Sequence, residues 1–596
     1  MQYTPISILA APASSKAALI ILIVISIALA LSSVIFTMMS AKSKNLTNSK
    51  LLLLGAFYVA TIVAIVCTII CISNYTNTTD DSLNVPDTSA TEETEPPTLP
   101  NDPSNWGIDW EIIVGTNIVG SYNRENPISF GKPSEYTQME GIITFRGDNY
   151  RSGATYGTAN VVNEIISEKW SSNISTLNGW PGSGWTGQPL IVRWDEQTKS
   201  IMNLYEEKKA KEDLVEVIYA TLDGNIYFFD LDDGSYTRDP LFIGMNFKGA
   251  GALDPRGYPL MYVGSGDYYN GKAPRMYIIS LIDGSVLFER TGSDGFTLRS
   301  DWAAFDSSPL VDAETDTLIW PGESGILYTI TLNTVYDAAV GTISIDPEET
   351  VKTRYQTPRA NADSYWLGYE PSAVIVDRYL YISENGGMFY CVDLNTMELV
   401  WAQDTKDDSN STPVFQMDAD GNGYIYTAPS LHWTADENSQ GPISIYKLNA
   451  QTGDIVWERS FNCHTVSGVS GGVQSTPLLG KPGTDIAGLI IYSVARTPSV
   501  KSGVLVALDT ETGEVVWQYD MTEYTWSSPT AVYTDDNKAY VVICDSAGKA
   551  ALLEGATGTV LDTVSLGSNV EASPAIFEDT VVVGTRGKKI YALKVQ

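Results

Sequence analysis

The amino-acid sequence predicts an all-β fold, an eight-bladed β-propeller, preceded by an N-terminal hairpin of two transmembrane helices. Three observations support this: a turn motif that repeats at a near-constant spacing, a Pro-containing strand start that recurs eight times, and two long apolar segments near the N-terminus. Repeats of this size are typical of solenoids and propellers, because one repeat alone cannot bury its apolar face and must stack against its neighbours.

Each copy of the repeated turn has an apolar residue, then Asp or a similar residue, and then Gly or a similar residue. The clearest copies span residues 448–457 and 508–517, and both end in Trp. Strand-like runs flank the turn, so each copy predicts a β-hairpin whose loop carries Asp, Thr and Gly. The turn positions are Gly234, Gly284, Met397, Gly453, Gly513 and Gly558. A degenerate copy near residues 332–334 divides the long interval between Gly284 and Met397 into two, so there are six intervals with a mean of 54 residues.

A second signature is a small or polar residue, then Pro, then an apolar run. Pro at the first residue of a strand costs no ladder hydrogen bond, so each copy predicts the start of a blade. The eight copies are Gln188-Pro189, Tyr258-Pro259, Ser308-Pro309, Glu370-Pro371, Thr412-Pro413, Thr476-Pro477, Ser528-Pro529 and Ser573-Pro574. They predict eight four-stranded blades.

The two ends of the repeat region complement each other. The last unit stops at Gln596 without an outer strand, whereas residues 165–170 resemble an outer strand that no hairpin precedes. Pairing these two segments would close the ring and remove the open sheet edge.

The Asp-x-x-Thr-Gly-x-x-x-Trp core of the repeat resembles the pyrroloquinoline-quinone (PQQ) repeat of quinoprotein-like eight-bladed propellers. Residues 145–153, Phe-Arg-Gly-Asp-Asn-Tyr-Arg-Ser-Gly, resemble the lead-in before the first blade of cofactor-free members. The resemblance covers about residues 140–596 and implies a propeller without a bound quinone. It also implies that the repeat tryptophans are structural and dock one blade against the next: Trp170, Trp401, Trp457 and Trp517.

Two apolar segments indicate a membrane anchor. After a short tail of residues 1–16, residues 17–39 and 51–72 carry no charge and are each long enough to cross a bilayer as a helix. Residues 40–50 between them hold three lysines, and no Lys or Arg follows the second segment until Arg124. The positive-inside rule therefore predicts a cytoplasmic loop and an extracytoplasmic C-terminal part at the cell membrane.

The segment after the second span predicts a stalk. Residues 73–103 are rich in Thr, Pro and Glu and contain seven acidic residues and no basic one, so they are expected to be disordered. Residues 104–139 have several apolar positions and predict either a strap or extra strands on the propeller, which spans residues 140–596.

Charge and cysteine content exclude several functions. The net charge is −34, with 37 Lys plus Arg against 71 Asp plus Glu, and so acidic a surface repels nucleic acid. The five cysteines show no metal-binding spacing, so we expect no metal site. The sequence leaves open whether Cys391, Cys463 and Cys544 include a disulfide.

Three functions are compatible with this fold. The first is a binding or scaffolding module for a protein or cell-surface ligand, which the membrane tether favours over an enzyme. The second is a carbohydrate-binding or carbohydrate-active domain, because aromatic faces stack on sugars and carboxylates transfer protons. The third is a PQQ-dependent dehydrogenase, but the adjacent cysteines common in alcohol-oxidising members are absent.

The loops that lead into the first strands should gather on one face of the disc and form the ligand site. We expect no catalytic residue there. Cys463 and His464 are neighbours in a strand and should point to opposite faces, which argues against a nucleophile pair. The candidate ligand-binding residues in these loops are Trp185, Trp302, Trp366, Glu370, Trp526 and Glu571.

Overall fold

The computed structural model describes residues 100–184, 187–299, 302–360, 367–432, 434–435, 438–466 and 470–596. The predicted spans at 17–39 and 51–72, and nearly all of the predicted stalk, lie outside these ranges. A search of the described ranges finds no helix of the length and apolarity that crossing a bilayer requires.

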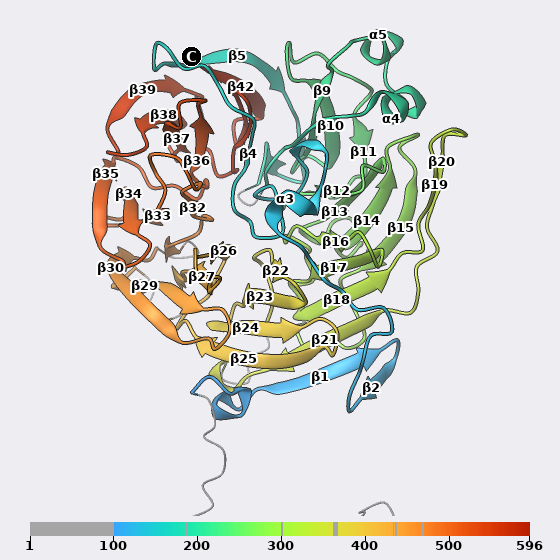
Figure 1. The fold of residues 1–596 in the computed structure, drawn as a ribbon, viewed down its shortest axis with the longest axis vertical. Helices are drawn as coiled ribbons and strands as arrows, with labels where there is room; N and C mark the ends of the chain where they lie inside the picture. Colours follow the sequence, from blue (N-terminus) through green and yellow to red (C-terminus); the bar gives the residue numbers. More distant parts are fainter. Residues whose placement is uncertain are drawn as a thin grey trace, which may run out of the picture. The chain divides into compact units, whose positions relative to one another are not determined.

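The described chain forms an eight-bladed β-propeller, as the repeat predicted (Figure 1). Each blade is an antiparallel sheet built around four strands. From the innermost to the outermost strand, the first four blades are β8 (Leu190–Arg193), β9 (Val215–Ala220), β10 (Asn225–Asp230), β11 (Leu241–Phe242); β12 (Ala252–Leu253), β13 (Leu260–Gly264), β14 (Arg275–Ser280), β15 (Val286–Thr291); β16 (Leu310–Asp312), β17 (Thr317–Pro321), β18 (Ile326–Thr331), β21 (Val351–Gln356); β22 (Val374–Val376), β23 (Tyr379–Ser383), β24 (Met388–Asp393), β25 (Glu398–Asp404).

The second four blades follow the same order. They are β26 (Val414–Met417), β27 (Gly423–Thr427), β29 (Gln440–Asn449), β30 (Ile455–His464); β32 (Leu478–Leu479), β33 (Leu489–Ala495), β34 (Gly503–Asp509), β35 (Val515–Met521); β36 (Thr530–Tyr533), β37 (Ala539–Cys544), β38 (Lys549–Glu554), β39 (Val560–Ser565); β40 (Ala575–Phe577), β41 (Thr580–Thr585), β42 (Lys589–Val595), β5 (Ile166–Asn173).

The ring closes through strands from the two ends of the propeller. β5 is the outermost strand of blade 8 and pairs antiparallel with β42, with Trp170 opposite Ala592. The predicted closure is therefore present, and it leaves blade 8 with the same four-strand order as the others.

One predicted blade start was wrong. Tyr258-Pro259 precedes β13, the second strand of blade 2, whereas the innermost strand β12 begins after Gly251. A Cβ on Gly251 would lie 3.0 Å from the carbonyl oxygen of Tyr262, so this position is too close to the neighbouring strand for a larger residue. In six of the other blades the Pro directly precedes the innermost strand, and Glu370-Pro371 lies slightly further upstream.

Four seams between blades contain the same tryptophan contact. Each indole Nε1 donates a hydrogen bond to a main-chain carbonyl of the next blade, and its ring lies against the turn Gly three residues further on, where a Cβ would clash. The repeat Trp of one blade thus packs directly against the repeat Gly of the next. The pairs are Trp170 with Leu231 (2.8 Å), Trp401 with Ala450 (3.1 Å), Trp457 with Thr510 (3.0 Å) and Trp517 with Gly555 (2.9 Å).

Two further seams use arginine in place of tryptophan. Between blades 1 and 2, Arg238 Nη1 donates to the carbonyl of Leu281 at 2.8 Å. Between blades 3 and 4, Arg124 Nε donates to the carbonyl of Leu394 at 3.2 Å. Both carbonyls lie at the same turn position as the carbonyls that accept hydrogen bonds from the indoles at the four tryptophan seams. Arg124 comes from outside the blades, so the segment before the propeller completes one of its seams.

An axial segment, residues 143–156, passes through the middle of the ring and contacts every blade (Figure 1). The Arg146 guanidinium donates to the carbonyls of Pro529 (2.9 Å) and Pro477 (3.0 Å). The Arg151 guanidinium donates to the carbonyls of Ala373 and Ser308, both at 2.9 Å. Both arginine side chains are fully buried, and burial lowers the pKa of each to about 10, so both stay charged at neutral pH.

Main-chain contacts attach the axial segment to the remaining blades. β3 (Glu140–Ile142) pairs with β8 of blade 1, and β4 (Thr155–Tyr156) pairs with β40 of blade 8. Axial carbonyls accept hydrogen bonds from inner strands of four blades: Ile143 from Leu253, Asn149 from Ile375, Tyr150 from Phe415 and Ala154 from Ile576.

Residues outside the repeat add to the rim and the loops. Residues 104–139 form β1 (Asp109–Val114) and β2 (Asn117–Val119), which extend the blade 3 sheet beyond β21, and then α3 (Pro133–Tyr136). The other additions are short: η1 (Pro103–Trp106), β6 (Thr176–Leu177), β7 (Trp180–Pro181), α4 (Glu196–Ile201), α5 (Glu206–Lys209), β19 (Val335–Asp337), β20 (Thr342–Ser344), η2 (Pro358–Ala360), β28 (Ser430–Leu431) and β31 (Gly471–Gly472).

The seam geometry makes a stability prediction. Trp517→Ala should lower the free energy of unfolding by about 3–5 kcal/mol, because it removes a buried indole and leaves a cavity against Gly558. The matched control is Phe242→Ala, an aromatic side chain that is 62% exposed, with an expected change of about 0.5 kcal/mol. Denaturant unfolding measures both, and equal destabilisation would contradict a docking role for Trp517.

Candidate functional site

The candidate residues of the described chain emerge on one face of the propeller. Strand direction alternates within each blade, so the loops between blades and the turns between second and third strands share one end of the sheets. We call this end the loop face. Trp302, Glu370, Trp526 and Glu571 lie in its interblade loops. Trp185 and Trp366 lie outside the described residues, so their contribution stays a prediction.

Two cations lie beside Trp302 on the loop face. Lys248 Nζ is 2.7 Å from Asp267 Oδ1, and Arg299 Nη1 is 3.7 Å from Glu323 Oε1. Both lie over the Trp302 ring, at 5.7 Å and 5.6 Å from its centroid. Lys248 and Arg299 are buried, whereas Trp302 is 36% exposed and forms part of the rim.

Three carboxyl groups complete this site, and we call Asp306, Glu323 and Glu370 the carboxylate cluster. Burial raises the pKa of Asp306 to about 8, against the opposing charge of Lys248. Burial also raises the pKa of Glu323 well above its usual range, and the neighbouring Glu370 raises it further. Glu370 has a raised pKa as well, again mainly from burial. The two carboxyls hydrogen-bond to each other, which raises the pKa of Glu323 and partly opposes the rise in the pKa of Glu370.

Gly368 shows how tightly the loops of blades 3 and 4 pack here. A Cβ at this position would lie 2.4 Å from the carbonyl oxygen of Glu323, 2.5 Å from Arg299 Nη1 and 3.0 Å from Asn385 Oδ1. Only Gly therefore permits this approach, which brings the two turns of neighbouring blades into contact.

A histidine–aspartate pair extends the site into blade 5. His432 Nδ1 lies 2.7 Å from Asp408 Oδ2, and Asn385 Nδ2 donates to Asp408 Oδ1 at 2.8 Å. Burial lowers the pKa of His432, but the hydrogen bond and charge of Asp408 outweigh this and raise it above the usual value. Sequence analysis missed this pair. The available signal was that both residues lie in loops of one blade that share the loop face.

Trp526 and Glu571 lie in loops that precede blades 7 and 8. Glu571 Oε1 accepts a hydrogen bond from Asn569 at 2.7 Å, and its Oε2 lies 3.6 Å from Arg586. Arg586 in turn lies over the ring of Trp180, as does Lys248, at 5.4 Å and 5.7 Å from the centroid. Trp180 thus connects Glu571 with the carboxylate cluster. Trp526 packs against Tyr524, with ring centroids 6.1 Å apart.

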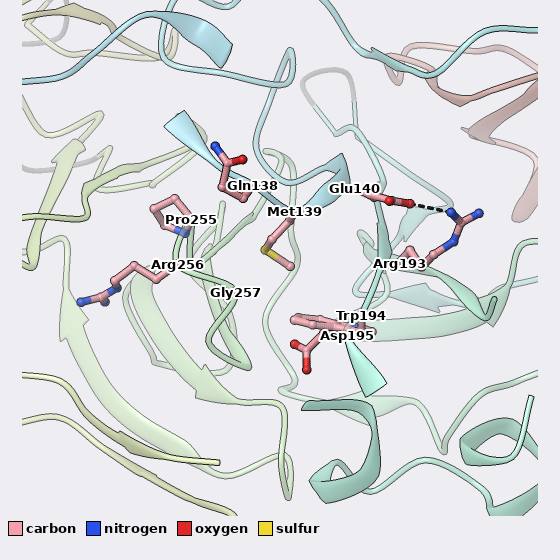
Figure 2. Close-up of a pocket in the computed structure, with 9 residues that line it drawn as sticks. All are labelled: Gln138, Met139, Glu140, Arg193, Trp194, Asp195, Pro255, Arg256 and Gly257. Atoms are coloured by element: carbon pink, nitrogen blue, oxygen red, sulfur yellow. Dashed lines mark hydrogen bonds and ion pairs between the residues drawn. The ribbon is translucent and has the colours of Figure 1, made fainter. Parts of the chain in front are cut away.

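A second concave site lies at the opposite face, beyond the far end of β8. Figure 2 shows this pocket, which has a volume of about 430 Å³. Glu140 and Arg193 on its rim form an ion pair at 2.5 Å. Arg256 pairs with Asp254 and Asp316, at 2.6 Å and 2.7 Å. Because these charges are neutralised within the protein, we place the candidate binding function at the loop face.

Comparison with known proteins identifies the repeat. A family model described as outer membrane protein assembly factor BamB matches residues 500–596. The dehydrogenase subunit of alcohol dehydrogenase (quinone) from Komagataeibacter europaeus is 25% identical over 200 residues, which cover 33% of this chain and 26% of that protein. Quinoprotein ethanol dehydrogenase from Pseudomonas aeruginosa is 24% identical over 161 residues. These residues cover 27% of this chain and 24% of that protein. The alignments span about a quarter of each relative.

Solved structures share the fold. Quinohemoprotein alcohol dehydrogenase ADHIIG from Pseudomonas putida HK5 superposes with a TM-score of 0.53 and 12% identity, covering 79% of this chain and 82% of that one. The quinohemoprotein alcohol dehydrogenase from Comamonas testosteroni superposes with a TM-score of 0.50 and 13% identity, covering 76% of this chain and 80% of that one. At this level of identity, the likeness shows the fold alone.

The described residues of the loop face offer no ready site for the divalent cation of such enzymes. Among the residues that the structure describes, no group of three or more His, Cys, Asp and Glu side chains could hold a metal ion. Lys248 and Arg299 already neutralise part of the carboxylate cluster. Cys391, Cys463 and Cys544 are buried, lie in three different blades and are free thiols, which also answers the question of a disulfide among them.

Asp306 makes a pH prediction. Its pKa is raised in the folded protein, so the folded state binds the proton more tightly and stability falls as pH rises from about 4 to about 8. Asp306→Asn cannot titrate and should lose less stability across this window than the wild type. Denaturant unfolding at both ends of the window measures the difference. Asp420→Asn, at an exposed turn, is the control, and equal pH dependence of wild type and Asp306→Asn would contradict the prediction.

The matched residues 500–596 include the whole of blade 7 and three strands of blade 8, and the same ring of blades continues through the rest of the propeller. Sequence similarity to the two quinone-dependent dehydrogenases is confined to about a quarter of each relative, and the two quinohemoprotein alcohol dehydrogenases share the fold. The chain is therefore similar to PQQ-like repeat β-propellers, most directly over residues 500–596.

Proposed function

We propose that this protein is a membrane-tethered propeller whose loop face binds a protein or another cell-surface ligand. The observation that carries the proposal is the polar site at that face, where loops of blades 2 to 5 bring the carboxylate cluster and the His432–Asp408 pair together. The match of residues 500–596 to an outer membrane assembly factor supports a binding role.

The tether and the location rest on the sequence. Residues 17–39 and 51–72 are long, uncharged apolar segments, and the three lysines between them favour a cytoplasmic loop. The propeller would then lie outside the cytoplasm, with residues 73–103 as an acidic spacer between it and the membrane. Such a spacer would hold the propeller away from the membrane surface.

A rigid platform suits binding better than redox chemistry in this chain. The axial segment fixes all eight inner strands, so the loops start from fixed positions and lose little conformational freedom when a partner binds. The described loop-face residues include no group of three or more His, Cys, Asp and Glu side chains that could hold a divalent cation beside a quinone. We therefore propose a non-enzymatic role without a bound quinone.

One cysteine-labelling experiment tests location and binding face together. Thr522→Cys introduces an exposed thiol into the interblade loop before blade 7, and Asp420→Cys introduces one at the opposite face. A membrane-impermeant, photoreactive maleimide is applied to intact cells. We expect both thiols to be labelled, and illumination to give a discrete crosslinked product from position 522 alone.

The controls make the result specific. Ser43→Cys lies in the predicted cytoplasmic loop and should stay unlabelled. The wild type should give only background, because Cys391, Cys463 and Cys544 are buried and the other two cysteines, Cys67 and Cys71, lie within the predicted second span. Labelling at position 43 without labelling at 420 would contradict the orientation. A product from position 420 alone would place the binding surface at the other face.

A further inference from the structure

Two glutamates from neighbouring blades meet beneath the loop face. Glu323 lies in the turn between β17 and β18 of blade 3, and Glu370 lies in the loop that precedes blade 4. Their carboxyl groups hydrogen-bond to each other. Glu323 is fully buried, and no N–H or hydroxyl group of the described residues donates to either of its carboxyl oxygens. Glu370 is therefore the partner that satisfies this carboxyl group, and we call the two residues the carboxyl pair.

A contact between two carboxyl groups needs a proton. An ionised carboxyl group has only acceptors, so one member of the carboxyl pair must carry the hydrogen that the other member accepts. If both were ionised, two negative charges would face each other at a position shielded from water, and their repulsion would break the contact. Burial raises the pKa of Glu323 well above its usual range, which favours the form that keeps the proton.

The surrounding charges do not compensate a second negative charge. Arg299 lies next to the carboxyl pair, with its Nη1 3.7 Å from Glu323 Oε1. Lys248 lies 2.7 Å from Asp267 and is already paired. The acidic groups that act on Glu370 are Asp306 and Asp408. Other titratable groups on the elements around the carboxyl pair are Tyr355, Tyr369, Glu384, Tyr390 and His432.

The carboxyl pair lies where loop 367–371 contacts the turns of two blades. The Tyr369 N–H donates to the carbonyl of Gly322 in blade 3 at 3.3 Å. The Asn385 N–H, in the turn of blade 4, donates to the carbonyl of Gly368 at 3.0 Å. Both hydrogen bonds require the loop to stay in place, so the two amides report whether the contact between the blades is made.

We propose that the carboxyl pair is a proton-dependent latch, which holds loop 367–371 against blade 3 and releases it when the pair loses its proton. Release would separate the loops of blades 3 and 4 and change the shape of the loop face. The inference adds regulation by pH to that face, and it rests on the proposed function only for what the face binds.

The direction of the response follows from proton linkage. The pKa of Glu323 is raised in the folded protein, so the closed latch binds the proton more tightly than the released loop does. The contact is therefore present at low pH and is lost as pH rises through the raised pKa.

Hydrogen–deuterium exchange of the purified full-length protein tests this proposal. Peptides that contain loop 367–371 and the turn at Asn385 are compared at about pH 6 and about pH 9, after correction for the intrinsic pH dependence of exchange. We expect the protection of both peptides to fall at least about tenfold at the higher pH. Equal protection of the wild type at the two pH values would overturn the proposal.

Glutamine variants separate the carboxyl pair from the other titratable groups. In Glu370→Gln the amide can donate to Glu323 without a titrating proton, so the protection of loop 367–371 should change by less than about twofold between the two pH values. Glu323→Gln should behave in the same way, which keeps the test valid if one variant fails to fold. A loss of protection as large as that of the wild type in the folded variants would contradict the latch.

Two control variants should keep the response of the wild type. Asp306→Asn removes a neighbouring carboxyl group whose pKa is raised to about 8, and Glu314→Gln removes an exposed glutamate from another turn of blade 3. Loss of the response in Asp306→Asn would assign it to Asp306 and contradict the proposal.

The outcome is separable from that of the proposed function, because the exchange experiment uses no partner. A crosslinked product at position 522 together with a pH-independent loop would retain the binding propeller and reject the latch. A pH-dependent loop without any crosslinked product would retain the latch and count against the binding role.

Discussion

The structure depends on two buried guanidinium groups at the axis of the ring. Arg146 and Arg151 donate hydrogen bonds to main-chain carbonyls of Pro529, Pro477, Ala373 and Ser308, where four different blades begin. A guanidinium carries five donors in a fixed plane, so one side chain can satisfy carbonyls from several strands at once. Inner strands that converge on an axis would otherwise leave these carbonyls buried and unpaired.

Away from the axis, side-chain contacts at the seams hold neighbouring blades together, and the residue that makes the contact differs from seam to seam. Four seams have a tryptophan against a glycine, and two have Arg124 or Arg238 at the equivalent carbonyl. Such fixed seams bring loops of neighbouring blades close enough for their side chains to act together. The carboxylate cluster combines the loops before blades 3 and 4 with a turn of blade 3, whereas the His432–Asp408 pair joins two loops of blade 5.

The repeat in the sequence predicted the features that recur from blade to blade. Eight blades and the closing strand pair followed from local signals, because turns and strand starts recur at one spacing. Arg124 and Arg238 were not predictable, because neither lies at the repeat position of the tryptophan that it replaces. His432 and Asp408 meet only when two loops of one blade fold side by side. Glu370 was chosen as a loop residue, but its adjacency to Glu323 depends on Gly368, which no periodic signal marks.

The most direct test of this account is the unfolding free energy of Arg151→Met against that of Arg378→Met, a partly exposed arginine on blade 4. Arg151→Met keeps an unbranched apolar stem but removes all of the hydrogen-bond donors that Arg151 supplies at the axis. The account predicts a loss of at least about 3 kcal/mol for Arg151→Met and less than about 1 kcal/mol for Arg378→Met. Equal unfolding free energies for the two variants would contradict it.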